Sequence, residues 1–209
     1  AYPNAKFVVD VKSTGLYHTD PELVNSGATV DYYKTGHSYI KRRTKNLNAL
    51  VGFEKSGHYF FNAPLGRGYD CGLTSAIAIL QMLDRNIDKT MADLYRELPK
   101  TWGSPTMSPY CSDEEKYYVV DAITDEYKKA LNNKEKICGL SIASLNTVNG
   151  IRVTLEDGTW GLVRASSNSP NLVVVVESPT SEEYKISMFH EIETRLSKYS
   201  QVGDYDQKV

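Results

Sequence analysis

Short apolar runs alternate with helical segments through the first hundred residues of the chain. Runs rich in β-branched and aromatic residues, which are typical of strands, cover residues 6–11, 28–33, 49–54 and 58–62. Segments with helical character cover residues 21–27, 38–48, 71–85 and 90–99. In the clearest of these helices, Leu73, Ile77 and Leu80 recur at helical spacing. Strands that alternate with helices predict an α/β domain over residues 1–99.

The pattern changes after residues 99–109, a stretch with three prolines and a glycine that we interpret as a linker or domain boundary. Beyond it we expect a helix at about 113–131, strands at 151–155, 160–166 and 171–178, and a last helix at about 180–199. Thr180 is predicted to cap the last helix, with Glu183 in its first turn. This order predicts an α+β domain around an antiparallel sheet, over residues 100–209.

Composition and charge exclude several classes of protein. The chain has 209 residues, of which 41% are hydrophobic and 24% charged, and its net charge is −2. We therefore expect no general attraction to nucleic acid or to anionic membranes, and no apolar run is as long as a membrane span. The cysteines are Cys71, Cys111 and Cys138. An odd count without a CxxC pair argues against a disulfide framework or a structural zinc site, and we expect a reducing, cytoplasmic setting.

Glu54, Ser56 and His58 stand at alternate positions of the stretch GFEKSGHYFF. An extended conformation would place all three on one face. The flanking glycines disfavour the helical alternative, in which Glu54 and His58 would form a metal site. A Ser–His nucleophile pair is also disfavoured, because no third group that would orient the histidine is visible. The remaining alternative is a solvated loop after a strand.

A second polar turn lies in YKTGHSYIKRR, residues 33–43. Gly36 makes a tight turn, His37 lies in it, and Ser38 is predicted to cap the helix that follows. A turn from a strand to a helix points to the carboxyl edge of the sheet, where open α/β folds bind ligands. The lysines of this stretch add positive charge for an anion. Taken alone, the stretch also fits a capped helix with a basic surface.

Residues 10–15, DVKSTG, form an equivalent turn at the end of the first predicted strand, with Lys12 inside it. Three strand ends that carry polar residues are therefore expected to converge, and this convergence says more than any one of them.

The third candidate is the stretch RASSNSP, residues 164–170, at the end of a predicted strand. Arg164 supplies a guanidinium suited to forked recognition of phosphate. The turn after it offers hydroxyls, an amide and free backbone N–H groups, which together can bind an anion. Its polar residues are Ser166, Ser167, Asn168 and Ser169. The alternative is a polar hairpin turn without a ligand.

Taken together, the motifs resemble those of the α-D-phosphohexomutases, and most of all those of the bacterial phosphomannomutase/phosphoglucomutases. In matching order and approximate spacing the chain contains DVKSTG, KTGHSYIKRR, GFEKSGHYFF with GYDCGLTSAI, and WGLVRASSNSP. The resemblance runs from Lys6 to about Leu196. It corresponds to most of the third domain, an α/β domain with a mixed sheet, and to all of the fourth, an antiparallel α+β domain. Because Ala1 directly precedes a predicted strand, we expect a fragment whose third domain is truncated at its N-terminus.

The resemblance implies a reaction. A phosphoserine in the first domain of these enzymes donates its phosphoryl group to a hexose phosphate, and the bisphosphate intermediate returns its other phosphoryl group to the serine. An Asp-rich loop upstream holds Mg²⁺, and neither that loop nor the serine loop is in this chain. The implied ligands are mannose or glucose 1- and 6-phosphates, with glucose 1,6-bisphosphate as intermediate and activator. The implied partner is the N-terminal part of the same enzyme.

By the same resemblance, Glu54 and Ser56 would bind sugar hydroxyls, with His58 near the cleft. The loop at 164–169 would hold the phosphate that is not transferred. Lys12 and His37 would also lie near the cleft. His37 would be close to the transferring phosphoryl group and would assist proton movement there. The chain departs from the family pattern at two places. Its phosphate loop reads Arg-Ala-Ser-Ser-Asn instead of Arg-x-Ser-Asn-Thr, and Cys71 replaces the second Asp of the usual Asp-Asp-Gly.

Two other functions remain open from the sequence. One is a free-standing module that binds a sugar phosphate or regulates another protein. The other is a two-domain α/β protein without a ligand.

Overall fold

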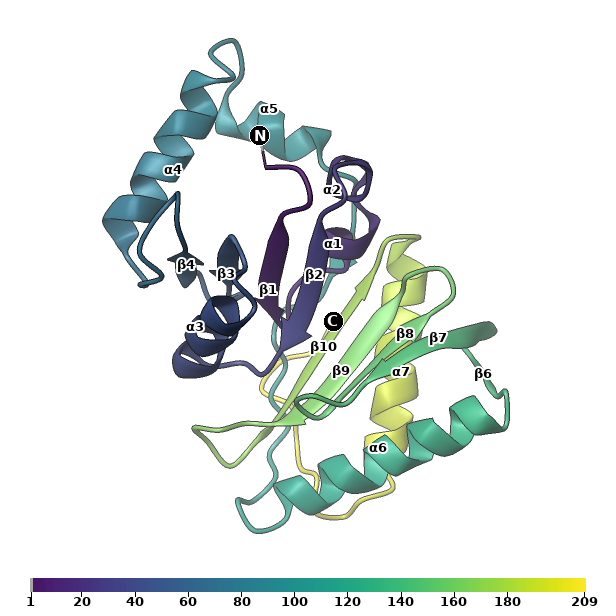
Figure 1. Ribbon diagram of the computed structural model, residues 1–209. Coiled ribbons are helices and arrows are strands. Elements are labelled where there is room, and N and C mark those ends of the chain that lie inside the picture. Colours follow the sequence, from purple (N-terminus) through teal and green to yellow (C-terminus); the bar gives the residue numbers. More distant parts are fainter. Residues whose placement is uncertain (1) are drawn as a thin grey trace. The chain divides into compact units, whose positions relative to one another are not determined.

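The computed structural model describes residues 2–209, which divide between Lys100 and Thr101 into two compact units. Figure 1 labels most of their helices and strands. The elements of the first unit are β1 (Lys6–Asp10), α1 (Leu16–Thr19), α2 (Pro21–Asn25), β2 (Thr29–Tyr33), α3 (His37–Asn46), β3 (Val51–Phe53), β4 (Tyr59–Phe61), α4 (Gly72–Asp84) and α5 (Met91–Glu97).

The first unit is built on a mixed sheet with the strand order β2-β1-β3-β4. Strand β1 is parallel to both β2 and β3, and β4 is antiparallel to β3. A mixed sheet with helices beside it confirms the predicted α/β class. The parallel strands β1, β2 and β3 bring their carboxyl ends to one edge of the sheet, and there lie the turns that carry the candidate residues.

Helix α3 covers one face of this sheet. Its Ile40 is fully buried and packs in a cluster with Val8, Ala49 and Phe60. Gly52 of β3 permits this close contact, because a Cβ atom there would lie 2.2 Å from the Thr44 hydroxyl oxygen. The opposite face carries a group of aromatic rings. Phe53 stacks on Phe7 and Tyr17, and its edge contacts are made with Tyr59 and Phe61.

Helices α4 and α5 have no buried residue, although α4 is strongly apolar. Leu73 is 72% exposed, Leu80 64% and Ile77 47%. Their spacing predicted that these three residues lie on one helix, and this prediction is confirmed. The core of the first unit, however, does not cover them.

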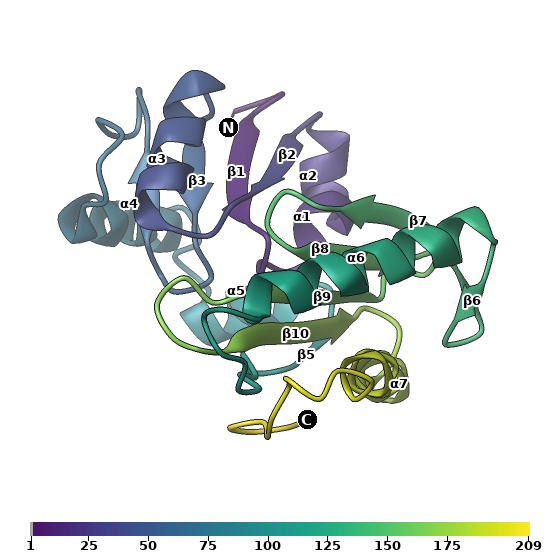
Figure 2. The ribbon, with the colours of Figure 1, turned by 90° about the horizontal axis from the view of Figure 1, so that it is seen from below.

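The elements of the second unit are β5 (Trp102–Gly103), α6 (Lys116–Asn132), β6 (Lys136–Ile137), β7 (Leu140–Asn146), β8 (Ile151–Leu155), β9 (Trp160–Ala165), β10 (Leu172–Ser178) and α7 (Glu182–Leu196). The strands form an antiparallel sheet in the order β5-β10-β9-β8-β7-β6. Helices α6 and α7 pack against one face of it (Figure 2). This arrangement confirms the predicted α+β class.

Alternation of side chains explains the core of the second unit. Ile151, Val153 and Leu155 of β8 face the helices and are at most 1% exposed. Strand β9 continues this face with Gly161, where a Cβ atom would lie 2.6 Å from carbon atoms of Met188 and Ile192. A glycine at this position therefore lets α7 lie close to the sheet.

Some elements differ from their predictions. Strand β7 was not predicted, because its sequence LSIASLN is half polar and its pairing with β8 is irregular between Ile142 and Ser144. The very short α1, β5 and β6 were also not predicted. The stretch interpreted as a linker pairs in part with β10, since the Met107 and Ser104 N–H groups donate to carbonyls of that strand.

Both predicted helix caps are wrong. Helix α7 is capped by Ser181, whose hydroxyl accepts from the Tyr184 N–H, while the Thr180 hydroxyl donates to Asp157. Helix α3 begins after Gly36, without a side-chain cap, and Ser38 lies inside its first turn. In both cases the helix begins one or two residues away from the position that the predicted cap would require.

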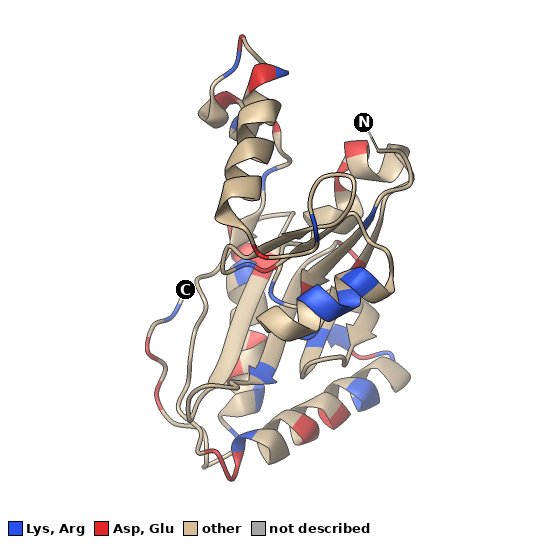
Figure 3. Cartoon of the chain, turned by 60° about the vertical axis from the view of Figure 1, so that its left-hand side comes forward, with Lys and Arg blue, Asp and Glu red and all other residues tan. Residues whose placement is uncertain are grey.

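The helices differ in their charge, in their length and in their apolar character. Basic residues gather on α3, which contains four of them and no acid (Figure 3). No helix within residues 2–209 has both the length and the apolar character that crossing a bilayer requires.

Candidate functional site

Residues 54–58 form the turn between β3 and β4, so the predicted extended conformation is wrong. The Glu54 N–H donates to the His58 carbonyl at 3.0 Å, and the Gly57 N–H donates to the Glu54 carbonyl at 2.9 Å. Gly57 has φ +92°, a conformation that favours glycine. The turn separates the three candidate side chains, because Glu54 is buried whereas Ser56 and His58 are exposed.

Glu54 lies beneath the turn and joins it to the start of α3. Its side chain is held by the Gly36 N–H, which donates to Oε1 at 2.9 Å. Gly36 has φ +133°, which an L side chain rarely adopts. The second oxygen, Oε2, is buried and has no hydrogen-bond partner within the described residues. Glu54 thus presents a fixed acceptor whose hydrogen bonding is incomplete, and a buried acceptor in this state gains from a ligand that donates to it.

His58 and His37 both face Asp70, a residue that the sequence interpretation did not use. His58 Nδ1 lies 2.6 Å from Asp70 Oδ2, and His37 Nε2 lies 3.8 Å from the same oxygen. The two imidazole rings meet edge to face, with their centroids 5.9 Å apart. The hydrogen bond from His58 lowers the pKa of Asp70. The third group that the sequence seemed to lack is therefore present, twelve residues beyond His58.

Asp10 fixes the turns at all three parallel strand ends. Its side chain is fully buried and accepts from the Ser13 hydroxyl at 2.7 Å, from the Thr35 hydroxyl at 3.3 Å and from the Lys55 N–H at 3.3 Å. Lys12 Nζ lies 3.7 Å from Asp10 Oδ2. One carboxylate therefore ties together the turns after β1, β2 and β3, and the predicted convergence of these turns is confirmed. From the sequence, the turn at residues 10–15 was named, but no role was assigned to Asp10.

Cys71 follows Asp70 and stands at the N-cap position of α4. Hydrogen bonds from the Thr74 hydroxyl and backbone lower the pKa of its thiol. The described residues contain no group of three or more His, Cys, Asp and Glu side chains that could hold a metal ion.

In the second unit, the polar loop after β9 is a compact turn. The Ser166 and Ser169 hydroxyl oxygens lie 2.9 Å apart, and the Asn168 N–H donates to the Ser166 hydroxyl at 3.4 Å. Ser167 and Asn168 are exposed, whereas Ser166 and Arg164 are largely buried. The Arg164 Nη1 donates to the Ala165 carbonyl at 2.9 Å, which holds the guanidinium beside the loop.

Lys116, which was not predicted as a site residue, supports this loop from the start of α6. It is the first residue of α6, is 3% exposed, and donates from Nζ to the Ser169 carbonyl at 3.1 Å. Its second partner is Asp113, at 2.5 Å. Lys116 therefore holds the loop through the Ser169 carbonyl, while Asp113 balances its charge.

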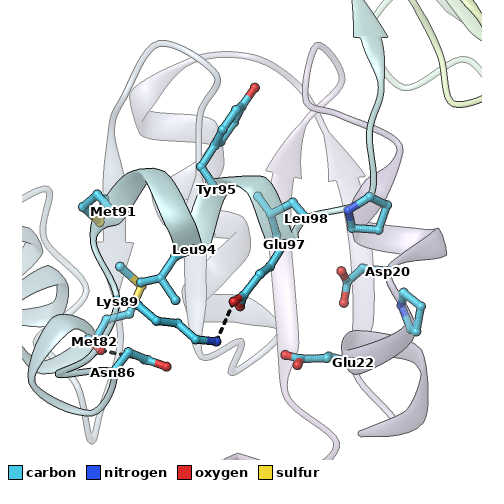
Figure 4. A pocket seen from close by; sticks show the side chains of 12 residues that line it. Asp20, Glu22, Met82, Asn86, Lys89, Met91, Leu94, Tyr95, Glu97 and Leu98 are labelled. Atoms are coloured by element: carbon cyan, nitrogen blue, oxygen red, sulfur yellow. Dashed lines mark hydrogen bonds and ion pairs between the residues drawn. The ribbon is translucent and has the colours of Figure 1, made fainter.

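A cavity of about 660 Å³ lies elsewhere in the first unit (Figure 4). It is lined by residues of α2, α5 and the end of α4, among them Met82, Met91 and Leu94, and its rim carries the Lys89–Glu97 ion pair. None of the predicted site residues lines it. The candidate site of the first unit is instead the set of polar turns at its strand ends. The second unit has a separate candidate site, the loop after β9.

Both units match known domain families. Residues 2–102 match the family described as phosphoglucomutase/phosphomannomutase, alpha/beta/alpha domain III, and residues 111–193 match the C-terminal domain of the same family. Among curated proteins, the chain is 31% identical over 181 residues to a phosphomannomutase/phosphoglucomutase of Pseudomonas putida, and 34% identical over 183 residues to a phosphoglucomutase of Neisseria meningitidis. The matches cover 87% and 86% of this chain but 36% of each relative, so the chain spans about a third of their length.

Solved structures give the same result. A phosphoglucomutase/phosphomannomutase family protein of Burkholderia thailandensis has a TM-score of 0.73 and 25% identity, over 94% of this chain and 38% of that one. An N-acetylphosphoglucosamine mutase of Aspergillus fumigatus, in complex with glucose 1,6-bisphosphate, has a TM-score of 0.55 and 10% identity, over 93% of this chain and 38% of that one. At 10% identity the second likeness concerns the fold alone.

Proposed function

The chain belongs to the phosphoglucomutase/phosphomannomutase family, and on this premise we propose that it is the substrate-binding part of a phosphohexomutase. Such an enzyme interconverts hexose 1-phosphates and hexose 6-phosphates through a bisphosphorylated sugar. A phosphoryl group passes from an enzyme phosphoserine to the free hydroxyl of the substrate, and the other phosphoryl group then returns to the serine. This chain supplies recognition of the sugar and of the phosphate. The phosphoserine and Mg²⁺, which neutralises charge on the transferring group, belong to other parts of the enzyme.

The Glu54 carboxylate is the observation that carries this proposal. It is 5% exposed, one oxygen is fixed by the Gly36 N–H, and the other has no hydrogen-bond partner within the described residues. A sugar hydroxyl is the kind of neutral donor that completes such an acceptor. Ser56, exposed in the same turn, adds a hydroxyl that both donates and accepts.

His37, His58 and Lys12 have supporting roles in this proposal. They lie at the same edge of the sheet as Glu54, and Asp70 and Asp10 hold them there. Two imidazoles and one ammonium group suit a substrate that carries phosphate. His37 assists proton movement at the transferring phosphoryl group, and Lys12 balances its charge.

The loop of Arg164 binds the phosphate that stays in place. The guanidinium lies beside a turn whose exposed side chains, Ser167 and Asn168, and backbone N–H groups can donate to phosphate oxygens. Lys116, buried beside the same turn, holds it in place by donating to the Ser169 carbonyl. Ser166 and Ser169 hold the turn closed through the contact between their hydroxyl groups.

Substitution of Arg164 tests the proposed function. Calorimetry with glucose 1-phosphate and mannose 1-phosphate should show that Arg164→Ala weakens binding by about 1.5–3 kcal/mol, the usual range for hydrogen bonds to a charged group. This corresponds to a loss of roughly ten- to a hundredfold in affinity. Lys128→Ala, which removes an exposed cation of α6 in the same unit, is the matched control and should leave binding unchanged. Equal affinities for the wild type and Arg164→Ala would refute the phosphate-binding role.

A further inference from the structure

His58 and Asp70 form the closest pair of ionisable groups at the strand ends of the first unit. Their atoms Nδ1 and Oδ2 are 2.6 Å apart. Asp70 is itself held in place, because its Oδ1 accepts from the Tyr59 N–H at 3.3 Å and its backbone forms a β-bridge with Phe60. Asp70 therefore has a fixed position relative to β4, the strand that His58 directly precedes.

The chemistry of the two groups determines where the imidazole proton lies. The hydrogen bond from His58 keeps the pKa of Asp70 low, so the carboxylate is ionised near neutral pH. An ionised carboxylate only accepts hydrogen bonds. The proton between the two groups must therefore be on His58 Nδ1, and in the neutral imidazole the lone pair is then on Nε2. Neutral histidine in water prefers the opposite tautomer, with the proton on Nε2.

The second imidazole restrains the same carboxylate from another direction. His37 Nε2 is 3.8 Å from Asp70 Oδ2, and the His37 ring packs edge to face on Phe60 with the centroids 4.8 Å apart. The same oxygen is thus shared by a short contact to His58 and a longer one to His37.

We propose that Asp70 is a positioning residue that holds His58 in the Nδ1–H tautomer, so that the Nε2 lone pair of this half-exposed ring can accept a hydrogen bond from a ligand. In this state His58 accepts a hydrogen bond from a ligand hydroxyl, while Glu54 provides a second acceptor at the other end of the same turn. The ligand's identity as a sugar phosphate rests on the proposed function, whereas the tautomer of His58 does not.

Nuclear magnetic resonance of the 209-residue chain tests the tautomer without any ligand. Long-range ¹H–¹⁵N correlations report which ring nitrogen carries the proton, and the signals of His58 are assigned by their loss in His58→Gln. The wild type should show His58 with the proton on Nδ1. In Asp70→Asn the amide NH₂ can donate to Nδ1, so the Nε2–H form should become the major one. Asp70→Glu should retain part of the Nδ1–H population.

Asp88→Asn is the matched control, because it removes an exposed acid of the same unit that lies between α4 and α5. It should leave the tautomer of His58 unchanged. Unchanged signals of His18, whose ring packs on Tyr32 in the same unit, would show that Asp70→Asn retains the fold. His37 does not serve this purpose, because it contacts Asp70 itself. The proposal is overturned if wild-type His58 is in the Nε2–H form, or if Asp70→Asn leaves the Nδ1–H form dominant.

Binding of glucose 1-phosphate, measured by calorimetry, completes the test. Asp70→Asn should lower affinity about tenfold, and Asp70→Glu should restore part of the loss. A tautomer change without any change in affinity would overturn the link between Asp70 and the ligand. A failure of the proposed function would give a different set of results. Wild type and Arg164→Ala would then both fail to bind sugar phosphates, while the tautomer result would remain.

Discussion

At the scale of single residues, the first unit depends on buried carboxylates that accept hydrogen bonds from the backbone. Asp10 accepts from the Lys55 N–H and Glu54 from the Gly36 N–H, so that each acid joins two turns that are distant in the sequence. Hydrogen bonds from backbone N–H groups to a carboxylate are strong and hold its position. Of the two acids, Glu54 retains an oxygen with no partner within the described residues, and for this reason we propose Glu54 as the ligand-binding one.

Glu54→Gln tests this distinction. Glutamine has the same shape and can still accept from the Gly36 N–H, but its NH₂ group replaces the second acceptor with a donor. We expect affinity for glucose 1-phosphate and mannose 1-phosphate to fall by about 1.5–3 kcal/mol, the range for a hydrogen bond to a charged group. The loss should be similar for both sugars, which differ only at C2, if Glu54 binds hydroxyls that the two share.

Calorimetry on the chain would measure both affinities, with Glu22→Gln as a control on an exposed acid of α2. A much larger loss for one epimer than for the other would mean that Glu54 recognises C2.

At the scale of elements, the sequence predicted most helices and strands, since apolar periodicity is strong in β1, β8, β10 and α6. It did not predict β7, whose side chains are too polar for the pattern, nor the turn at Glu54, where alternation of residue types imitates an extended strand. Asp70 was not recognised as a site residue, because the contact with His58 depends on the loop between β4 and α4. Such a contact follows from the fold and leaves no spacing in the sequence.

A polar network joins helices α6 and α7. It predicts how the stability of the second unit depends on pH. The Tyr199 hydroxyl donates to Glu126 Oε1 at 2.7 Å, and Arg195 contacts Glu126 from the other side. Burial and the hydrogen bond to Glu126 raise the pKa of Tyr199 to about 12, from 10. Because the pKa is raised in the folded state, the neutral hydroxyl stabilises the fold below pH 10. This contribution is lost as the pH rises through about 12.

Tyr199→Phe should therefore destabilise the second unit by about 1 kcal/mol at pH 8, a typical value for one hydrogen bond. The difference from wild type should shrink as the pH rises from 10 to about 12. Both tryptophans, Trp102 and Trp160, lie in the second unit, so their fluorescence follows the unfolding of that unit. Tyr117→Phe, at an exposed tyrosine of α6, should show no such pH dependence. A difference that stays constant up to pH 12 would contradict this account of Tyr199.

At the scale of the whole molecule, the two units differ in how completely they bury their apolar residues. In the second unit, α6 and α7 share a continuous core with the sheet. In the first unit, α4 exposes a row formed by Leu73, Ile77 and Leu80, spaced four and three residues apart and thus on one helix face. A contiguous apolar surface of this kind promotes association in water.

We expect the 209-residue chain to self-associate as its concentration rises. Light scattering coupled to size-exclusion chromatography would show a mass above 23.4 kDa that increases with concentration. The double variant Leu73→Glu/Leu80→Glu should shift the chain toward monomer, because two carboxylates then interrupt the apolar row. The matched control is Tyr117→Glu/Tyr118→Glu, which adds the same two charges at exposed positions of α6 in the other unit. If association depends on the row on α4 rather than on net charge, this control should associate like wild type. A wild-type chain that remains monomeric up to high concentration, or a control that dissociates as fully as the α4 variant, would show that α4 is not the associating surface.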